Sequence, residues 1–317
     1  MNRKIAVLGA NPAWQKTLSF KNFSCGKVNR AYQLDEFASG KGVNFCRASI
    51  VYGSAEPCLL QFAGGENGKR LVDMLDKLAI CHLTSFTATP TRCCTTILNE
   101  SDNSTTECIE PSFAVSDSEA ENLLKMAEKI MPECCFAAVC GTLPGETDKK
   151  VYREFASIAA KNSVPLLLDA CKGVDDVFTT GCGIHLKINR EELFSMTGKE
   201  SVEEAFAKLF STYPAILSAA VTDGPEQAFA SDGKKLVKYQ LPKLDNIVST
   251  LGCGDTASAV YSGALAGGLD FEPAFKKALA AASANCLSHL CGSFNTADAD
   301  KIESSITVSR EKIQWAK

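Results

Sequence analysis

The stretch Thr-Leu-Gly-Cys-Gly-Asp-Thr-Ala occupies residues 250–257 and leads directly into a helix-like run of small residues. Gly252 and Gly254 let the backbone turn tightly, so that peptide N–H groups point at one spot, and the following helix adds its positive N-terminal end. Such an anion hole suits the charge on a transferring phosphoryl group, and Asp255 can accept the proton of an attacking hydroxyl. The alternative is a plain glycine turn in which Asp255 is the helix N-cap.

A second glycine turn, Ser-Gly-Lys-Gly-Val-Asn at residues 39–44, also opens a helix-like segment. Lys41 stands between two glycines and can approach an anion with little steric shielding, while Asn44 can hydrogen-bond sugar hydroxyls. This is not a Walker A loop, because the G-x-x-x-x-G-K-[ST] spacing is absent. The alternative is an ordinary strand-to-helix loop.

A third candidate, Lys-Ile-Asn-Arg-Glu-Glu at residues 187–192, follows a strand-like run. Asn189 and Glu192 are separated by about one helical turn, so both can face the same site. An amide and a carboxylate at this spacing suit a water-mediated Mg²⁺ ion beside nucleotide phosphates. The alternative is a capping arrangement at a helix start.

Short apolar runs alternate with amphipathic segments over most of the chain. This alternation predicts βαβ units and a mostly parallel sheet, whose ligands bind beyond the carboxyl ends of the strands. The predicted strands include 5–8, 59–62, 137–139, 166–168, 185–188 and 219–221, and the predicted helices include 119–130, 151–161 and 202–209.

Two segments, at about 12–37 and 88–112, interrupt this alternation. They contain strand-like stretches rich in Thr and Cys with no helix between them, and Pro12, Gly26 and Pro90 mark turns. We expect both segments to contribute hairpin strands to a small β appendage over the edge of the main sheet.

The composition narrows the possible classes of function. The length of 317 residues suits one large α/β domain with a small appendage. A formal charge of −4 and the absence of any Lys/Arg run argue against a nucleic-acid partner. No window is apolar enough to span a membrane, and the apolar run at 5–8 is too short for a signal peptide, so we expect a cytoplasmic protein.

The fifteen cysteines include no C-x-x-C pair, and the chain has only three histidines. A Cys/His zinc site is therefore not expected. Most of the cysteines stand among apolar residues and should pack as small reduced side chains, which indicates a reducing compartment.

Glycine-rich and polar motifs follow one another from residue 11 to about residue 295. They are Asn11-Pro12-Ala13, Gly40-Lys41-Gly42-Val43-Asn44, Gly64-Gly65-x-x-Gly68, Gly141-Thr142-Leu143-Pro144, Lys187-x-Asn189-x-x-Glu192 and Gly252-x-Gly254-Asp255. Each is weak alone, but together and in this order they resemble the PfkB/ribokinase family of carbohydrate kinases. The resemblance implies a ribokinase-like α/β fold: a three-layer αβα sandwich with a mostly parallel central sheet and a small β-sheet lid, forming one domain over residues 1–317.

Within that family, the Gly-Thr-Leu-Pro segment and residues 26–30 resemble the hexose-phosphate branch, which includes 1-phosphofructokinase and tagatose-6-phosphate kinase. This implies ATP-dependent, Mg²⁺-supported phosphorylation of fructose 1-phosphate, tagatose 6-phosphate or fructose 6-phosphate, with Asp255 as general base and a homodimer formed through the lid. The implied roles are an anion hole for the amides of Gly252, Cys253 and Gly254, substrate binding for Gln15, Lys27, Arg30, Gly40, Lys41, Asn44, Arg92 and Thr142, nucleotide binding for Lys187, Asn189, Glu192, Thr222, Gly224 and Asn285, and Mg²⁺ binding through water for Asn189 and Glu192.

The chain departs from the family pattern at several positions. Gln15 stands where relatives carry Asp, so it keeps a hydrogen-bond acceptor but loses the charge. Ser39 replaces the first glycine of its motif, and Leu251 and Cys253 stand where Thr and Ala are usual. Because an anion hole works through backbone amides, we expect the change at Cys253 to matter little.

Two other functions stay open. A ribokinase-like kinase of an unphosphorylated sugar or nucleoside would not need Lys27, Arg30 or Arg92. Alternatively, the chain could bind a sugar phosphate with weak activity, as a sensor or partner protein. The retained Asp255 and the motif at 187–192 argue against the last possibility, since a sensor need not keep them.

Overall fold

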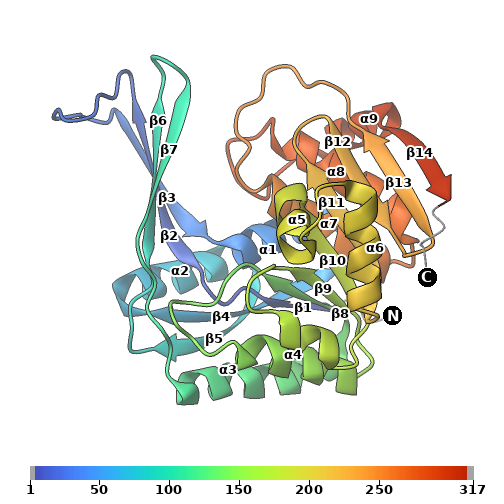
Figure 1. Ribbon diagram of the computed structural model, residues 1–317. Helices are drawn as coiled ribbons and strands as arrows, with labels where there is room; N and C mark the ends of the chain where they lie inside the picture. The colour runs from blue at the N-terminus through green and yellow to red at the C-terminus, as the bar shows by residue number, and fades with distance from the viewer. Residues whose placement is uncertain (1–3, 313–317) are drawn as a thin grey trace.

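The structure is a computed structural model that describes residues 4–312. The single domain expected over residues 1–317 includes 1–3 and 313–317, which lie outside the described residues. A ten-stranded sheet in the order β14-β13-β12-β11-β10-β9-β8-β1-β4-β5 forms the centre of the molecule (Figure 1). Its parallel part consists of β11 (Ile216–Asp223), β10 (Ile184–Asn189), β9 (Leu166–Asp169), β8 (Cys134–Cys140), β1 (Lys4–Leu8), β4 (Glu56–Gly64) and β5 (Cys81–Thr87).

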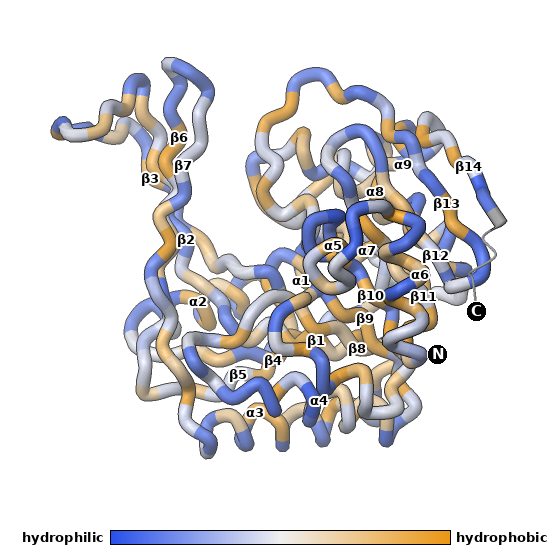
Figure 2. Tube along the Cα trace, in the orientation of Figure 1, coloured by the Kyte–Doolittle hydropathy of each residue, from blue (hydrophilic) through white to orange (hydrophobic). Residues whose placement is uncertain are grey.

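The parallel strands are nearly continuous apolar runs because helices cover both faces of the sheet. Every residue of β9 is buried, for example, and Figure 2 shows the hydrophobic colouring concentrated along the central strands. One face packs against α1 (Lys41–Tyr52), α2 (Gly65–Lys77), α7 (Cys253–Ala266), α8 (Phe271–Asn285) and α9 (Thr296–Ser305). The other packs against α3 (Asp117–Ile130), α4 (Lys150–Lys161), α5 (Arg190–Thr197), α6 (Val202–Thr212) and the short 3₁₀ turns Met131–Glu133 and Asp175–Thr179.

These layers confirm the α/β sandwich and the mostly parallel sheet that the motifs implied. Each of the predicted strands and helices lies within an observed element of the same kind. One edge of the sheet was not predicted: three antiparallel strands extend it beyond β11. They are β12 (Gln227–Ser231), β13 (Lys235–Gln240) and β14 (Thr307–Lys312).

A separate four-stranded sheet rises from one end of the molecule (Figure 1). Its order is β3-β2-β6-β7, with β2 antiparallel to β3 and parallel to β6. The loop that joins β2 to β3 and the turn that joins β6 to β7 both project away from the main sheet (Figure 1). The strands are β2 (Ala13–Phe20), β3 (Gln33–Ser39), β6 (Cys93–Asn99) and β7 (Ser104–Ile109).

Membrane insertion by a helix finds no support in the part of the chain that the structure describes. Within residues 4–312, no helix combines the length and the apolar composition that a membrane crossing requires.

Candidate active site

Helix α7 begins at a turn that only glycine fits. Its N-cap, Gly252, has a φ of 78°, in the left-handed region, and offers no side-chain hydrogen bond to the helix. A Cβ at this position would lie 2.8 Å from the Cβ of Cys291. The first turn of α7 therefore starts without a side-chain cap, and it carries Asp255, which is only 8% exposed.

The start of α1 lies opposite the start of α7. Gly40, its N-cap, has a φ of 117°, and a Cβ there would come within 2.9 Å of the backbone of Pro12. From the first turn of α1, the Asn44 side chain donates a hydrogen bond of 2.8 Å to Oδ2 of Asp255. The buried Arg47 donates to Oδ1 of Asn44 at 3.4 Å, so one side chain of α1 orients the partner of Asp255.

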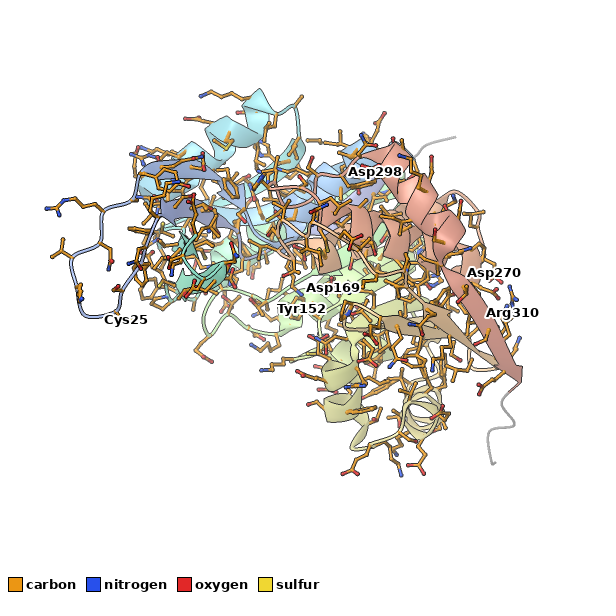
Figure 3. The ribbon with its side chains drawn as sticks, turned by 90° about the horizontal axis from the view of Figure 1, so that it is seen from above. Cys25, Tyr152, Asp169, Asp270, Asp298 and Arg310 are labelled. Carbon is orange, nitrogen blue, oxygen red and sulfur yellow. The ribbon has the colours of Figure 1, made fainter. Side chains whose placement is uncertain are left out.

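A second buried carboxylate, Asp169, ends strand β9 and joins three elements. Its Oδ1 lies 3.2 Å from Nζ of Lys41, and its Oδ2 lies 3.7 Å from Nζ of Lys187 on β10. Ser258 of α7 also donates a hydrogen bond of 2.6 Å to Oδ2. Seen from above, Asp169 lies in the interior of the molecule (Figure 3). This carboxylate thus holds two lysines and α7 at the carboxyl end of the sheet.

The two carboxylates differ in their affinity for a proton. Burial and the neighbouring charge of Asp169 raise the pKa of Asp255 to about 6. Burial opposes ionisation of Asp169 as well, but Lys187, Lys41 and Ser258 lower its pKa overall. The Asp169 charge in turn raises the pKa of Lys41. Asp169 is therefore a permanent anion that balances the lysines, whereas Asp255 can exchange a proton near neutral pH.

The ammonium group of Lys187 lies at the first turn of α7. A Cβ at Gly254 would be 3.1 Å from Nζ of Lys187, a contact that the glycine avoids. Lys187 is only 5% exposed, so its charge is held in a fixed place. A positive charge and the N-terminal end of a helix therefore meet at one spot, which is a favourable environment for an anion.

Two neighbouring cavities surround these groups and share Lys41, Arg92, Asp169 and Glu192. The larger, of about 420 Å³, lies between the small sheet and the main sheet, and the smaller has about 330 Å³. The predicted residues that line the larger cavity are Gln15, Gly40, Lys41, Asn44, Arg92, Lys187, Asn189, Glu192, Thr222, Gly252, Gly254 and Asp255. Thr142 lines the smaller one.

Two side chains of the predicted substrate set make local hydrogen bonds. Nε2 of Gln15 donates to Oγ1 of Thr96 at 2.8 Å, on the neighbouring strand of the small sheet. Oγ1 of Thr142 accepts from Nδ2 of Asn11 at 3.3 Å. The motifs at 11–13 and 141–144 are thereby joined across the smaller cavity.

Five predicted residues line neither cavity. The roles of all the predicted site residues, whether or not they line a cavity, stay predictions. Lys27 and Arg30 belong to the projecting loop between β2 and β3, whose position Cys25 marks in Figure 3. Gly224 follows β11 with a φ of 65° and is exposed. The side chain of Asn285 is buried, and the side chain of Cys253 points toward helix α8.

Asn285, predicted to bind nucleotide, makes hydrogen bonds to backbone and side-chain groups near the start of α7. Its Nδ2 donates to the carbonyl of Leu251 at 3.0 Å, and its Oδ1 accepts from the amide of Gly292 at 2.9 Å. Oγ1 of Thr256 donates to the same Oδ1 at 3.2 Å. The amide thus positions the turn that enters α7.

Asn189 and Glu192 form the capping box that the sequence left open as an alternative. The amide of Asn189 donates to Oε2 of Glu192 at 2.9 Å, and the amide of Glu192 donates to Oδ1 of Asn189 at 2.8 Å. Among the described residues, no group of three or more His, Cys, Asp or Glu side chains could hold a metal ion.

Sequence reasoning missed Asp169, Arg47 and Ser258. For Asp169 a signal was available, because it directly follows the predicted strand 166–168 and so stands at the ligand-binding edge of a parallel sheet. Arg47 and Ser258 carried no such signal, since their role depends on which element each helix faces.

Comparison with known proteins agrees with this geometry. The chain is similar to a provisional phosphofructokinase from Staphylococcus aureus, with 25% identity over 97% of this chain and 99% of that one and a TM-score of 0.79. It shares its fold with phosphofructokinase-2 from Escherichia coli (21% identity, 96% and 99% of the two chains, TM-score 0.87). The same holds for a provisional 1-phosphofructokinase from Thermotoga maritima (18%, 98% and 100%, TM-score 0.85).

The match to a known family covers almost the whole chain. Residues 2–298 match the pfkB family of carbohydrate kinases. The chain therefore belongs to this family, as its motifs indicated, and is an ATP-dependent sugar kinase.

Proposed function

We propose that the protein transfers the γ-phosphoryl group of ATP to a hydroxyl of a ketohexose phosphate: fructose 1-phosphate, tagatose 6-phosphate or fructose 6-phosphate. The observation that carries this proposal is the position of Asp255, a buried carboxylate with a pKa of about 6 that lies between the starts of α1 and α7. A carboxylate there can meet an acceptor hydroxyl while the end of α7 meets the phosphoryl group.

Asp255 would be the general base. Asn44 donates to Oδ2, which leaves Oδ1 to accept the proton of the acceptor hydroxyl. At neutral pH a carboxyl with a pKa of about 6 is mostly ionised, yet basic enough to take a proton as the new P–O bond forms. The sugar oxygen gains the phosphoryl group, ADP leaves, and the proton stays on Asp255 until solvent removes it.

The migrating phosphoryl group would be held at the first turn of α7. Because Gly252 offers no side-chain cap, the amides of Gly252 and Gly254 can donate to phosphoryl oxygens, and the amide of Cys253 can do so by giving up a long hydrogen bond of 3.5 Å to the carbonyl of Thr250. The buried Lys187 supplies a positive charge beside Gly254. Asp169 would keep that lysine in place through their ion pair.

The donor set fits a nucleotide with its metal ion. Lys187 and the uncapped α7 suit phosphates, and Thr222 lines the same cavity. Glu192 uses Oε2 in the capping box, which leaves Oε1 for a water of a Mg²⁺ ion, while Asn189 keeps Glu192 oriented. Mg²⁺ would neutralise charge on the phosphates of ATP. Gly224 and Asn285 line neither cavity, and Asn285 would act on the nucleotide side through the backbone that it holds before α7.

Arg92 is the strongest candidate for holding a phosphate already present on the substrate. Arg92 lines both cavities and its Nη2 donates to the carbonyl of Asn11 at 3.2 Å, while its Nε is buried without a hydrogen-bond partner among the described residues. Beyond the N–H that Asn11 accepts, the planar guanidinium keeps others, among them that of Nε, and such a group suits a bidentate contact with phosphate. Lys41, which is paired with Asp169, would add its remaining N–H groups.

Lys27 and Arg30 would reach a phosphate only if a second copy of the chain brought them there. They belong to the loop between β2 and β3, which projects from the small sheet (Figure 1), and they line neither cavity of their own chain. We therefore include a homodimer through this sheet, acting as a lid, in the proposal. Measurement of the molecular mass in solution tests this part separately.

We also propose a cytoplasmic setting for the reaction. All fifteen cysteines lie in the described part of the chain, and each is a free thiol. Free thiols in this number are typical of proteins from reducing compartments. Fractionation of the source cells would test the location.

A kinase of an unphosphorylated sugar is the second candidate. It is favoured by the outward position of Lys27 and Arg30, which leaves only Arg92 and Lys41 as cations at the cavities among the predicted phosphate ligands. In that case Arg92 would be dispensable for activity.

A substrate panel separates these candidates. ADP release from Mg-ATP would be measured with fructose 1-phosphate, fructose 6-phosphate, tagatose 6-phosphate, fructose and ribose, for the wild type and for Arg92→Met. We expect turnover with a phosphosugar that Arg92→Met weakens through KM. Faster turnover with a free sugar, unaffected by Arg92→Met, would replace the proposal by the second candidate.

A further inference from the structure

Two thiols touch at the turn that enters α7. Sγ of Cys253, in the first residue of α7, lies 3.1 Å from Sγ of Cys286, which directly follows α8. The two helices lie side by side over much of their length (Figure 1). Both cysteines are half-buried, so small reagents can reach them.

The pair is tied to the backbone of the turn from both sides. Nδ2 of Asn285 donates to Sγ of Cys253 at 3.3 Å. The carbonyl of Cys286 accepts from the amides of Val248 and Ser249, at 2.8 and 3.2 Å, just before the turn. A change in the distance between the two sulfurs must therefore move the chain that precedes Gly252.

The electrostatics of the pair favour one thiolate. The hydrogen bond between the thiols lowers the pKa of Cys286 and raises that of Cys253. The third cysteine of this region, Cys291, is different, because burial raises its pKa to about 11. A thiolate is the form that peroxides oxidise, so the chemistry should begin at the pair and not at Cys291.

We propose that Cys253 and Cys286 are a modification site, at which a peroxide converts two thiols into a reversible disulfide. The thiolate attacks one oxygen of hydrogen peroxide, the O–O bond breaks, and after proton uptake a sulfenic acid and one water result. The second thiol then attacks the sulfenic sulfur, forms the S–S bond and releases a second water. Two thiols are oxidised by two electrons, and one peroxide is reduced to two waters.

The disulfide would disturb the start of α7. The sulfurs must close from 3.1 Å to about 2.05 Å, the length of an S–S bond. This draws the first residue of α7 toward α8 and removes the thiol acceptor of Asn285. Displacements of this size at a positioned reacting group lower rates steeply. The effect on turnover rests on the proposed function, whereas the bond itself does not.

A second thiol pair provides a matched control. Sγ of Cys58 on β4 also lies 3.1 Å from Sγ of Cys81, its register partner on β5. This pair lines neither cavity, and burial raises the pKa of Cys58. The sulfur–sulfur distance is thus the same in a pair at the start of α7 and in a pair on β4 and β5. The effect of the distance between two thiols can therefore be tested separately from the effect of their position in the fold.

The experiment compares the wild type with Cys286→Ser and Cys81→Ser. Each protein is treated with hydrogen peroxide, digested without reduction and analysed for linked peptides, and part of the sample is then treated with dithiothreitol. In the wild type and in Cys81→Ser we expect a Cys253–Cys286 linkage, a loss of kcat of about tenfold or more and recovery on reduction. Cys286→Ser should keep its activity in peroxide.

Each other result overturns the proposal. Absence of the linkage in folded, peroxide-treated wild type excludes the site, and a linkage that leaves both kcat and amide exchange of residues 250–256 unchanged excludes its effect on the turn. Inactivation that persists in Cys286→Ser assigns the sensitive thiol elsewhere. If no sugar is phosphorylated at all, linkage and amide exchange still decide the matter, so this failure is distinct from failure of the proposed function.

Discussion

Helices α5 and α7 both begin at the larger cavity, and each carries a carboxylate as its third residue. In α5, Glu192 turns back to accept from the amide of the N-cap, and Asn189 caps the helix in return. In α7 the N-cap is Gly252, which cannot do this, and Asp255 is held by Asn44 of another helix. The same helical position therefore caps its own helix in one case and is held by a neighbouring helix in the other, although both carboxylates line the larger cavity.

The difference shows how a helix start becomes available to a ligand. A capping box satisfies the orphan amides of the first turn with the side chains of the helix itself. A glycine cap leaves those amides to whatever enters the cavity. An acid at the third position is free to act on a substrate only if a neighbouring element supports it, as Asn44 and Arg47 do for Asp255.

The largest effect is expected from Asp255→Asn. Without the base, kcat should fall by about 10²–10⁴. The same change should stabilise the fold, because a pKa raised from 3.8 to about 6 means that the ionised carboxyl is unfavourable above pH 6. The free energy of unfolding at pH 7.5 should rise by about 1–3 kcal/mol. This gain should vanish as the pH falls below 3.8, the pKa of the Asp255 carboxyl in the unfolded chain. Steady-state kinetics and urea unfolding measure the two quantities.

The matched change at α5 is Glu192→Gln. Glutamine is accepted in a capping box, and Glu192 is half-buried, not fully buried like Asp255, so we expect no comparable gain in stability. Near-normal turnover of Asp255→Asn would contradict the role of Asp255 as the base. An equal gain in stability for both variants would contradict the difference that we infer between the carboxylates of α5 and α7.

The second-largest expected effect is on the pH dependence of kcat. Since Asp255 must be ionised to act, kcat should fall about tenfold per pH unit below pH 6. The charge of Lys41 lowers the pKa of Asp255, so Lys41→Met should move this acid limb to higher pH. Lys77→Met, at an exposed position of α2, should leave the limb in place. A rate that stays constant down to pH 5 would contradict the assignment of the base.

The sequence predicted the start of α7 better than its surroundings. Glycine turns and buried strands are local features, so 250–257 and strand 166–168 could be read from residue types alone. The hydrogen bond from Asn44 to Asp255 joins positions 211 residues apart, and the contact between the thiols of Cys253 and Cys286 joins positions 33 apart. Such pairs depend on how helices pack, which no local pattern encodes.

Lys27 and Arg30 show that a sequence motif does not reveal where its side chains lie relative to a cavity. Their motif suggested a phosphate contact, yet the hairpin between β2 and β3 carries both away from the cavities of their own chain. Likewise, Asn189 and Glu192 fitted a metal site and a capping box equally well by spacing. Only the observed hydrogen bonds show that the capping box forms.

The smallest effects come from the two caps themselves, through Gly252→Ala and Asn189→Ala. A left-handed residue with a Cβ costs about 1–2 kcal/mol, and here the Cβ also meets Cys291 at 2.8 Å, so Gly252→Ala should displace the turn. We expect a loss in kcat of about tenfold. Asn189→Ala should cost about 0.5–2 kcal/mol of stability through the lost cap.

The two variants are distinguished by activity, because stability falls in both. Asn189→Ala should change kcat little and raise the Mg²⁺ concentration for half-maximal rate by up to about tenfold, since Asn189 acts through the orientation of Glu192. Ser201→Ala removes the cap of α6, which lines neither cavity, and should lower stability alone. If Asn189→Ala lowered kcat as far as Gly252→Ala at saturating Mg²⁺, α5 would also act on the reacting groups, and the distinction between a capped and an uncapped helix start would fail.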